Sequence, residues 1–127
     1  MENQPAANKF IRWFDPRNRQ VGSWAFILNR ITAIGLTIYL FLHLIVLSSL
    51  ARGPEAYDSF IDLATSPLFK FGELFVIAGG IIHGLNGIRV GITSFGIGIR
   101  KQKEMFYVIM VISVIGTAIF AIKMFIL

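Results

Sequence analysis

The sequence has no cysteine and only two histidines, His43 and His83. The absence of cysteine excludes disulfides, cysteine-ligated iron–sulfur clusters and haem attached through thioether bonds. Any metal chemistry in this chain must therefore use histidine or methionine. Acidic residues are also few, 7 against 12 Lys and Arg, which gives a net charge of +5. In so apolar a chain, basic residues report membrane topology first, and we expect no nucleic-acid partner.

Long polar stretches are also missing. Hydrophobic residues make up 55% of the 127 residues, and the mean hydropathy is +0.70. A transmembrane helix needs about 20 mostly apolar residues, and the stretches 24–50, 68–93 and 105–127 meet this requirement. Together with an N-terminal segment, 1–22, they account for most of the chain. The sequence therefore predicts an all-α membrane protein, a single domain over 1–127 with three transmembrane helices.

Basic residues are concentrated on two of the segments outside the predicted helices. By the positive-inside rule, we predict a cytoplasmic N-terminus, a cytoplasmic 94–104 connection and an outward-facing 51–67 connection, in a multi-pass protein of the inner (cytoplasmic) membrane. Residues 8–14 are typical either of a segment lying among lipid headgroups or of an ordinary tail. Three helices alone bury little surface, so we expect a larger bundle with a partner. The basic residues are Lys9, Arg12, Arg17, Arg19, Arg100, Lys101 and Lys103.

Both histidines fall inside predicted spans, where an ionisable side chain is costly without a partner and therefore indicates function. His83 has glycines at i−4, i−3 and i+4, on its own helix face. A face cleared of side chains would admit a porphyrin beside an axial ligand. Two other interpretations stay open: a neutral histidine bonded to a neighbouring helix, and close helix packing through GxxxG. The glycines are Gly79, Gly80 and Gly87, and the packing pair is Gly80 and Gly84.

His43 has no comparable clearing on its helix face. It is either an axial haem ligand or a residue bonded to a partner helix, with Tyr39 and Thr37 as polar neighbours. Counted from the predicted helix ends, it lies in the outer half of the membrane and His83 in the inner half, about 16 Å apart along the axis. The other residues on its face are Leu36, Tyr39, Leu40 and Leu47.

That separation is too large for two ligands of one iron, because a metal–imidazole bond is only about 2 Å long. If both histidines are ligands, they serve two haems. The opposite imidazoles must then come from another chain, because this sequence has no third histidine.

Two arginines, Arg30 and Arg89, fall toward the cytoplasmic ends of the first and second spans, and we expect them at a shared depth. Guanidinium groups in a low dielectric form strong charge-assisted hydrogen bonds. Their candidate partners are haem propionates or a quinone carbonyl. The alternative is that the side chains snorkel to lipid phosphate.

Three segments, SWAFILNRITAIG, FLHL and HGLNGIRV, resemble the cytochrome b subunit of succinate dehydrogenase, and the likeness spans all three helices. In that family a helix-two His-x-x-x-Gly-x-Arg motif supplies an axial haem ligand, and it is complete here as His83, Gly87 and Arg89. A helix-one His-Arg-x-Ser/Thr-Gly motif contributes to the quinone site and is incomplete here, although Arg30 and Thr32 match. Asn29 stands where the family has His, and Ala33 stands where it has Gly. The family also has a Ser before this motif, where the present sequence has Phe26, and Ser23, one turn earlier, could replace that Ser.

The resemblance implies a function in electron transfer. Family members bind a flavoprotein subunit, an iron–sulfur subunit and usually a second membrane anchor, and electrons from succinate reach membrane quinone through them. It implies one or two b-type haems per complex, with His83 and His43 as axial ligands, the latter as in the di-haem branch. It implies that Arg30 and Ser23 bind quinone and that Arg30 and Arg89 bind propionates. The chain itself has no succinate site.

A second class of function stays open on the sequence. A non-redox membrane protein, such as a packing or assembly subunit or an element of a small transporter, would use buried His and Arg for structure alone. A visible spectrum separates the two classes, because bis-imidazole haem absorbs in sharp bands.

Overall fold

The structure is a computed structural model in which residues 21–127 are described. This part forms three long helices, a short helix and two 3-10 turns, and it contains no strand. The predicted headgroup segment 8–14 and the basic residues before position 20 lie outside the described residues. The elements are α1 (Val21–Ser48), η2 (Ser49–Arg52), α2 (Pro54–Ala64), α3 (Pro67–Ser94), η3 (Ile99–Lys101) and α4 (Gln102–Phe125).

The long helices α1, α3 and α4 are long and apolar enough to cross a membrane. α1 and α3 have 28 residues each and α4 has 24, which corresponds to about 36–42 Å against a hydrocarbon core of about 30 Å. In lipid every backbone polar group must be satisfied internally, and a helix achieves this within one segment. The prediction of an all-α membrane protein with three transmembrane helices is confirmed.

The connections are shaped by proline and glycine. Pro54 and Pro67 occupy the first turns of α2 and α3, where the missing amide hydrogen costs no helical bond. Gly53, before α2, has φ 110°, and Gly98, before α4, has φ 71°. Side chains disfavour such backbone, so these glycines permit the two tight entries into helices.

A short helix, α2, occupies the connection that the sequence analysis treats only as an outward-facing segment. Its acidic residues Glu55, Asp58 and Asp62 share one helix face, by their spacing. On the other side, the ring of Phe60 packs edge-on against Phe69 of α3, with centroids 6.4 Å apart. This division into a charged face and an apolar face is typical of a helix lying at a membrane surface.

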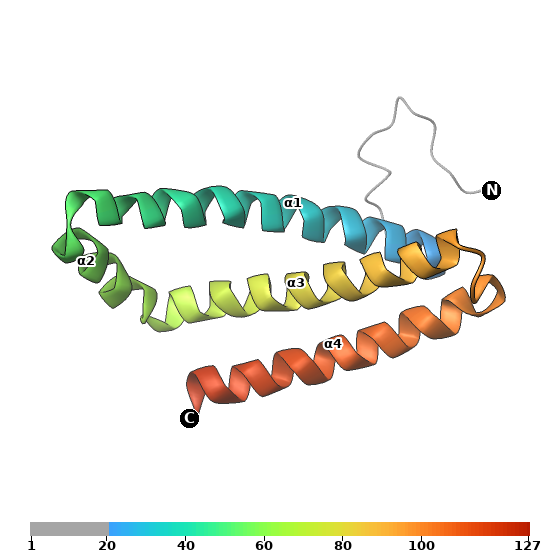
Figure 1. Ribbon diagram of the computed structural model, residues 1–127. Coiled ribbons are helices and arrows are strands. Elements are labelled where there is room, and N and C mark those ends of the chain that lie inside the picture. Colours follow the sequence, from blue (N-terminus) through green and yellow to red (C-terminus); the bar gives the residue numbers. More distant parts are fainter. Residues whose placement is uncertain (1–20) are drawn as a thin grey trace.

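α3 is the central long helix, with α1 on one side and α4 on the other (Figure 1). α1 and α3 run antiparallel, approach each other where α1 begins and diverge toward α2 (Figure 1). The buried part of the described chain is therefore small, and much apolar surface remains for lipid or a partner. Its members are Ala25, Ile27, Phe106, Ile109, Ser49, Asn86, Arg89 and Ser113.

α4 is bonded to α3 near both of its ends. At one end Arg89 donates to Gln102, with 3.4 Å between Nη1 and Oε1. At the other end the Lys70 ammonium donates to the carbonyl of Met124 at 3.3 Å. These bonds hold α3 and α4 together as a hairpin, whereas α1 is bonded to α3 only through its first half.

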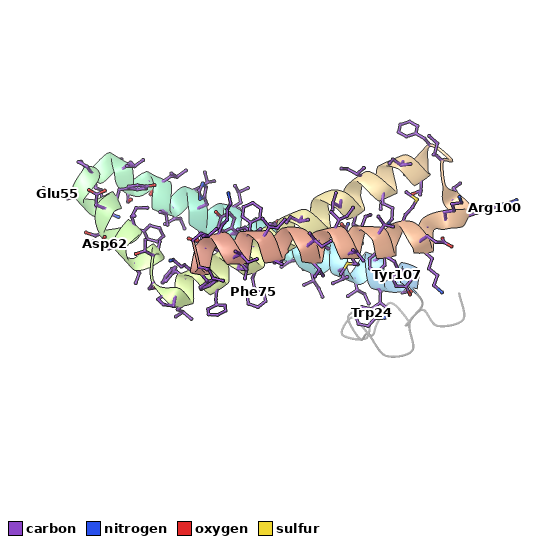
Figure 2. All side chains as sticks on the ribbon, turned by 90° about the horizontal axis from the view of Figure 1, so that it is seen from below. Trp24, Glu55, Asp62, Phe75, Arg100 and Tyr107 are labelled. Carbon is purple, nitrogen blue, oxygen red and sulfur yellow. The ribbon has the colours of Figure 1, made fainter. Side chains whose placement is uncertain are left out.

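The two ends of the bundle differ in charge. Glu55 and Asp62 lie at the end formed by α2, and Arg100 lies at the opposite end (Figure 2). Exposed Trp24 and Tyr107 lie in the half toward Arg100 (Figure 2). Trp and Tyr favour the membrane–water interface because their rings carry a polar atom.

Candidate functional site

His83 lies on α3 and faces the first half of α1. Its Nδ1 atom is 3.3 Å from the backbone carbonyl oxygen of Asn29 and 3.3 Å from the hydroxyl oxygen of Thr32. The imidazole is half-buried between the two helices. The structure therefore shows the bond to a neighbouring helix that the sequence analysis left open. The geometry of this bond also matters for the other interpretation of His83, that of an axial ligand.

The neighbours of Nδ1 assign the tautomer of His83. A backbone carbonyl only accepts hydrogen bonds. The single hydroxyl hydrogen of Thr32 points to backbone, with the Leu28 carbonyl at 2.7 Å and the Asn29 carbonyl at 3.1 Å, so the hydroxyl oxygen also faces the ring as an acceptor. Nδ1 therefore carries the hydrogen, and in the neutral imidazole Nε2 keeps its lone pair. A neutral imidazole binds a metal in this form.

The glycines around His83 divide into two groups. A Cβ at Gly79 would stand 3.9 Å from an α1 side chain, and one at Gly80 would stand 4.0 Å from another. A Cβ at Gly84 or Gly87 would meet no described atom within 4 Å. Gly79 and Gly80 therefore face α1 and allow its close approach. The open space on α3 lies at Gly84 and Gly87 instead, so it differs from the clearing that the sequence suggests.

One turn from His83, a buried chain of hydrogen bonds joins the three long helices. Asn86 donates from Nδ2 to the Ala25 carbonyl of α1 at 3.2 Å and accepts from Arg89 Nε at 2.8 Å. Arg89 continues the chain to Gln102 at the start of α4. Arg89 is 7% exposed, and both side chains that accept from it are uncharged amides. They accept hydrogen bonds from two of its five donors and do not neutralise its charge.

The hydrogen bonds between α1 and α3 set their antiparallel register. Asn29 lies level with His83, and the bond from Asn86 to α1 continues this register. The same register places the Cα atom of Arg30 near the depth of His83, and the Cα atom of Arg89 about 11 Å nearer than that of Arg30 to the end where α1 begins. The expectation that the two arginines share a depth therefore does not hold for their Cα atoms, because counting from each helix end ignores how the helices are aligned. The guanidinium of Arg30 nevertheless reaches back over the Phe26 ring, one turn toward the level of Arg89.

Arg30 lies on an exposed side of α1. Its guanidinium carbon is 4.7 Å from the centroid of the Phe26 ring, a distance typical of a cation–π contact. Phe26 is 45% exposed, and Ser23, one turn before it, is half-exposed. A hydroxyl, an aromatic ring and a cation therefore follow one stripe along the first turns of α1.

His43 lies apart from this cluster, about fourteen residues beyond the level of His83, or about 21 Å along α1. Its Nδ1 is 3.5 Å from the Tyr39 hydroxyl, and the two rings stack with centroids 5.5 Å apart. A hydroxyl both donates and accepts, so this contact does not assign the tautomer.

The surroundings of His43 follow from the divergence of α1 and α3. His43 comes eleven residues after Thr32, about three turns later, and so lies on nearly the same helix face. That face packs against α3 at Thr32, but at His43 it is exposed. His43 belongs to the second half of α1, and α1 and α3 diverge toward α2 (Figure 1). The face that holds His43 is therefore left without a partner from the described chain.

Between residues 21 and 127, no three His, Cys, Asp or Glu side chains gather closely enough to hold a bare metal ion. A haem iron requires less of the protein, because the porphyrin supplies four nitrogen ligands and leaves only axial positions for side chains. The two histidines are too far apart along the helix axis to bind one metal ion together.

Comparison with known proteins settles the family. A family model described as "Succinate dehydrogenase/Fumarate reductase transmembrane subunit" matches residues 3–120. The chain belongs to this family. The "Succinate dehydrogenase hydrophobic membrane anchor subunit" of Halobacterium salinarum is 31% identical over 105 residues, 82% of this chain and 78% of that protein. The "Succinate dehydrogenase 2 membrane subunit SdhC" of Mycobacterium tuberculosis is 29% identical over 89 residues, 69% of this chain and 65% of that protein.

Membership of the succinate dehydrogenase/fumarate reductase transmembrane subunit family confirms the resemblance drawn from three sequence segments. The structure also brings two of these segments into contact, because Asn29 and Thr32 of the first lie against His83 of the third. The matched range 3–120 contains every residue that the sequence analysis selects for a site. These are Ser23, Arg30, His43, His83 and Arg89.

Asn86 is the residue of this region that the sequence analysis does not select. It is 1% exposed. The sequence alone could have indicated it, because a carboxamide within a transmembrane span is costly unless it forms hydrogen bonds. Its position three residues after His83 also puts it on a neighbouring part of the same helix face. Asn29 carries a second polar signal, since its Oδ1 is buried without a hydrogen-bond partner in the described chain.

Proposed function

We propose that the chain is a haem b-binding membrane anchor of a succinate dehydrogenase complex, which passes electrons from a partner's iron–sulfur clusters to membrane quinone. Both relatives are named as membrane subunits of succinate dehydrogenases. The proposed partners are a flavoprotein subunit, an iron–sulfur subunit and a second membrane anchor. Succinate oxidation belongs to the partners, and this chain contributes to the membrane part of the path.

The observation that carries the proposal is the arrangement around His83. Metal-binding histidines commonly donate their second ring N–H to a backbone carbonyl or another acceptor, which fixes the ring and the tautomer. The Asn29 carbonyl and the Thr32 hydroxyl are such acceptors, and they leave Nε2 of His83 available to iron. Gly87 follows His83 by four residues on the same helix face, and a Cβ there would meet no described atom within 4 Å. When bound, haem b supplies one-electron transfer.

Arg89 is the proposed partner of a haem propionate. Buried charges in proteins are normally paired. Arg89 donates hydrogen bonds to Asn86 and Gln102, and both of these side chains are neutral. A propionate carboxylate would supply the missing negative charge. The position of Arg89, nearer than His83 to the end where α1 begins, suits propionates that point toward that surface.

Arg30 and Ser23 are the proposed quinone-binding residues. A quinone carbonyl accepts a hydrogen bond, and a guanidinium or hydroxyl donates one. Phe26, between them in the stripe, offers a flat apolar surface on which a quinone ring can lie. Arg30 lies on an exposed side of α1 with its guanidinium over the Phe26 ring, and it remains a second candidate for a propionate.

His43 is the proposed axial ligand of a second haem. An imidazole exposed at membrane depth is unfavourable unless something other than lipid covers it, and the divergence of α1 and α3 leaves room there. The opposite ligands of both irons would come from a partner anchor. The axial distance between His43 and His83 requires two separate haems.

The proposed location is the inner (cytoplasmic) membrane with the N-terminus in the cytoplasm. Arg100 and its basic neighbours lie at the end where α1 begins and α2 with its acidic residues lies at the other (Figure 2). The positive-inside rule assigns the basic end to the cytoplasm.

A visible spectrum with a redox titration of the purified complex tests the proposal. We expect b-type haem bands and two redox steps in the wild type, with the inner haem lost in His83→Ala and the outer haem lost in His43→Ala. Thr37→Ala is the control, because the Thr37 hydroxyl is exposed and bonds only within its own helix.

Two outcomes would change the assignment. A wild-type complex without haem bands would make the chain a packing or assembly subunit, and the proposal would fail. A complex with one haem that is lost in His83→Ala and kept in His43→Ala would leave His43 as a packing residue.

A further inference from the structure

Asn86 is a buried carboxamide whose two ends contact different groups. Its Nδ2 donates to the Ala25 carbonyl and its Oδ1 accepts from Arg89 Nε. Ala25 is 0% exposed, and its small side chain lets α1 approach closely enough for the first bond. The carboxamide is thereby anchored to one helix while it holds an arginine on its own helix.

The arrangement determines where the charge of Arg89 lies. A long arginine side chain has many rotamers and tends to move its head group toward water. The Asn86 carboxamide and Gln102 instead direct it along the inside of the helix hairpin, where it is 7% exposed. Without Asn86, the guanidinium would lose its shorter hydrogen bond and would be free to turn toward the membrane surface.

We infer that Asn86 is a positioning residue, which holds the Arg89 charge close to the His83 site and so sets the reduction potential of the haem there. This inference rests on the proposed haem ligation by His83. Arg89 follows His83 by six residues, about 9 Å along the helix axis. A fixed positive charge at that range favours the reduced, electron-richer iron, and the low dielectric of the membrane strengthens the effect.

The test is a redox titration of the haem in complexes that carry Asn86→Leu, Arg89→Met and both substitutions. We expect each single variant to make reduction about tenfold less favourable, a lowering of about 59 mV for a one-electron step. The double variant should match Arg89→Met alone, because Asn86 acts through the arginine and the two effects do not add.

Ser113→Ala is the matched control. Ser113 is as deeply buried as Asn86, but its hydroxyl donates only to the Ile109 carbonyl of its own helix, so the haem potential should stay at the wild-type value. If Asn86→Leu does not assemble, the same titration is made on Asn86→Ser. Serine adds no bulk and is too short to join Ala25 to Arg89.

The outcomes separate this inference from the function on which it rests. A haem whose potential is unchanged in the Asn86 variants, with only haem content or thermal stability reduced, would make Asn86 a purely structural residue and overturn the inference alone. A fully additive double variant would also overturn it. A wild-type complex without haem would instead remove the proposed function.

Discussion

The two histidines differ in the group that faces Nδ1. At His83 that group is a carbonyl together with a hydroxyl whose hydrogen is used elsewhere, so one tautomer is assigned. At His43 it is the Tyr39 hydroxyl, which supports either tautomer. Hydrogen bonds within this chain therefore hold His83 in the orientation that the proposed haem ligation requires, whereas the orientation of His43 depends on what covers its exposed face.

Thr32→Val tests the role of the hydroxyl at His83. Valine has nearly the shape of threonine but cannot accept a hydrogen bond from Nδ1, so we expect haem to bind about tenfold more weakly. This is the lower end of the loss of affinity that follows removal of a residue bonded to a metal ligand, because the Asn29 carbonyl still accepts from Nδ1. Haem content and haem dissociation from the purified complex are the measurements. Thr32→Ser should restore wild-type binding, and equal losses in both variants would point to packing of the methyl group.

Arg30→Ala tests the quinone assignment. Losing a charge-assisted hydrogen bond costs about 1.5–3 kcal/mol, so we expect quinone reductase activity per haem to fall about tenfold or more, with haem content largely retained. Arg52→Ala, at an exposed arginine near the other end of the bundle, is the control and should leave activity unchanged. Unchanged activity per haem in Arg30→Ala would remove this residue from the quinone site.

At the scale of elements, α1 presents different faces to different partners. One face packs against α3 through Ala25, Asn29 and Thr32, and an exposed stripe carries Ser23, Phe26 and Arg30. The packing face continues past His43 after α3 has moved away. The helix thus combines an internal contact with two surfaces that are largely exposed in the described chain.

Gly79→Leu tests the close approach of α1 to α3. A Cβ at this position already stands 3.9 Å from the Thr32 methyl group, so a leucine should push α1 away and weaken the contacts of His83. We expect about 1–3 kcal/mol of destabilisation, as for other overpacked sites, together with loss of haem. Thermal unfolding and haem content of the complex measure both effects.

Gly35→Leu is the control for that substitution, because a Cβ at Gly35 meets no described atom within 4 Å. It should leave the packing of the three helices intact. If Gly79→Leu were as stable and as rich in haem as the wild type, close packing at Gly79 would not be what holds Asn29 and Thr32 against His83.

At the scale of the whole molecule, the described helices bury few side chains and leave wide apolar surfaces. In lipid this surface carries no hydrophobic penalty, and helix association depends on small residues and polar contacts. The chain has both, in the glycines of α3 and in the buried chain from Ala25 through Asn86 and Arg89 to Gln102. The proposed function requires further subunits to complete the proposed sites that face outward from the three helices.

The orientation in the membrane is tested by labelling. The chain has no cysteine, so a cysteine at Ser59 in α2 gives a single reporter on this subunit. We expect an impermeant thiol reagent to reach it on intact cells, whereas a cysteine at Lys101 should react only after the inner face is opened. A Ser59→Cys variant that reacts only after opening would mean that the topology is inverted.

Much of this architecture could be predicted from the sequence because membrane spans depend on local composition. Hydrocarbon excludes unsatisfied backbone groups, so each long apolar run must form a helix, and this held for α1, α3 and α4. His83 could be selected because an imidazole within a span stands out against apolar neighbours and its motif is intact. These inferences need no knowledge of which helix lies beside which.

Only the tertiary structure decided the features that depend on register between helices. It showed that Asn29 and Thr32 lie against His83, that the Cα atoms of Arg30 and Arg89 differ in depth, and that Asn86 bonds across to α1. The short helix α2 likewise emerged only in the fold, where Phe60 meets Phe69. Hydropathy reports whether a residue enters the membrane, but a hydrogen-bond partner some fifty positions away is determined by how two helices align, which no local pattern records.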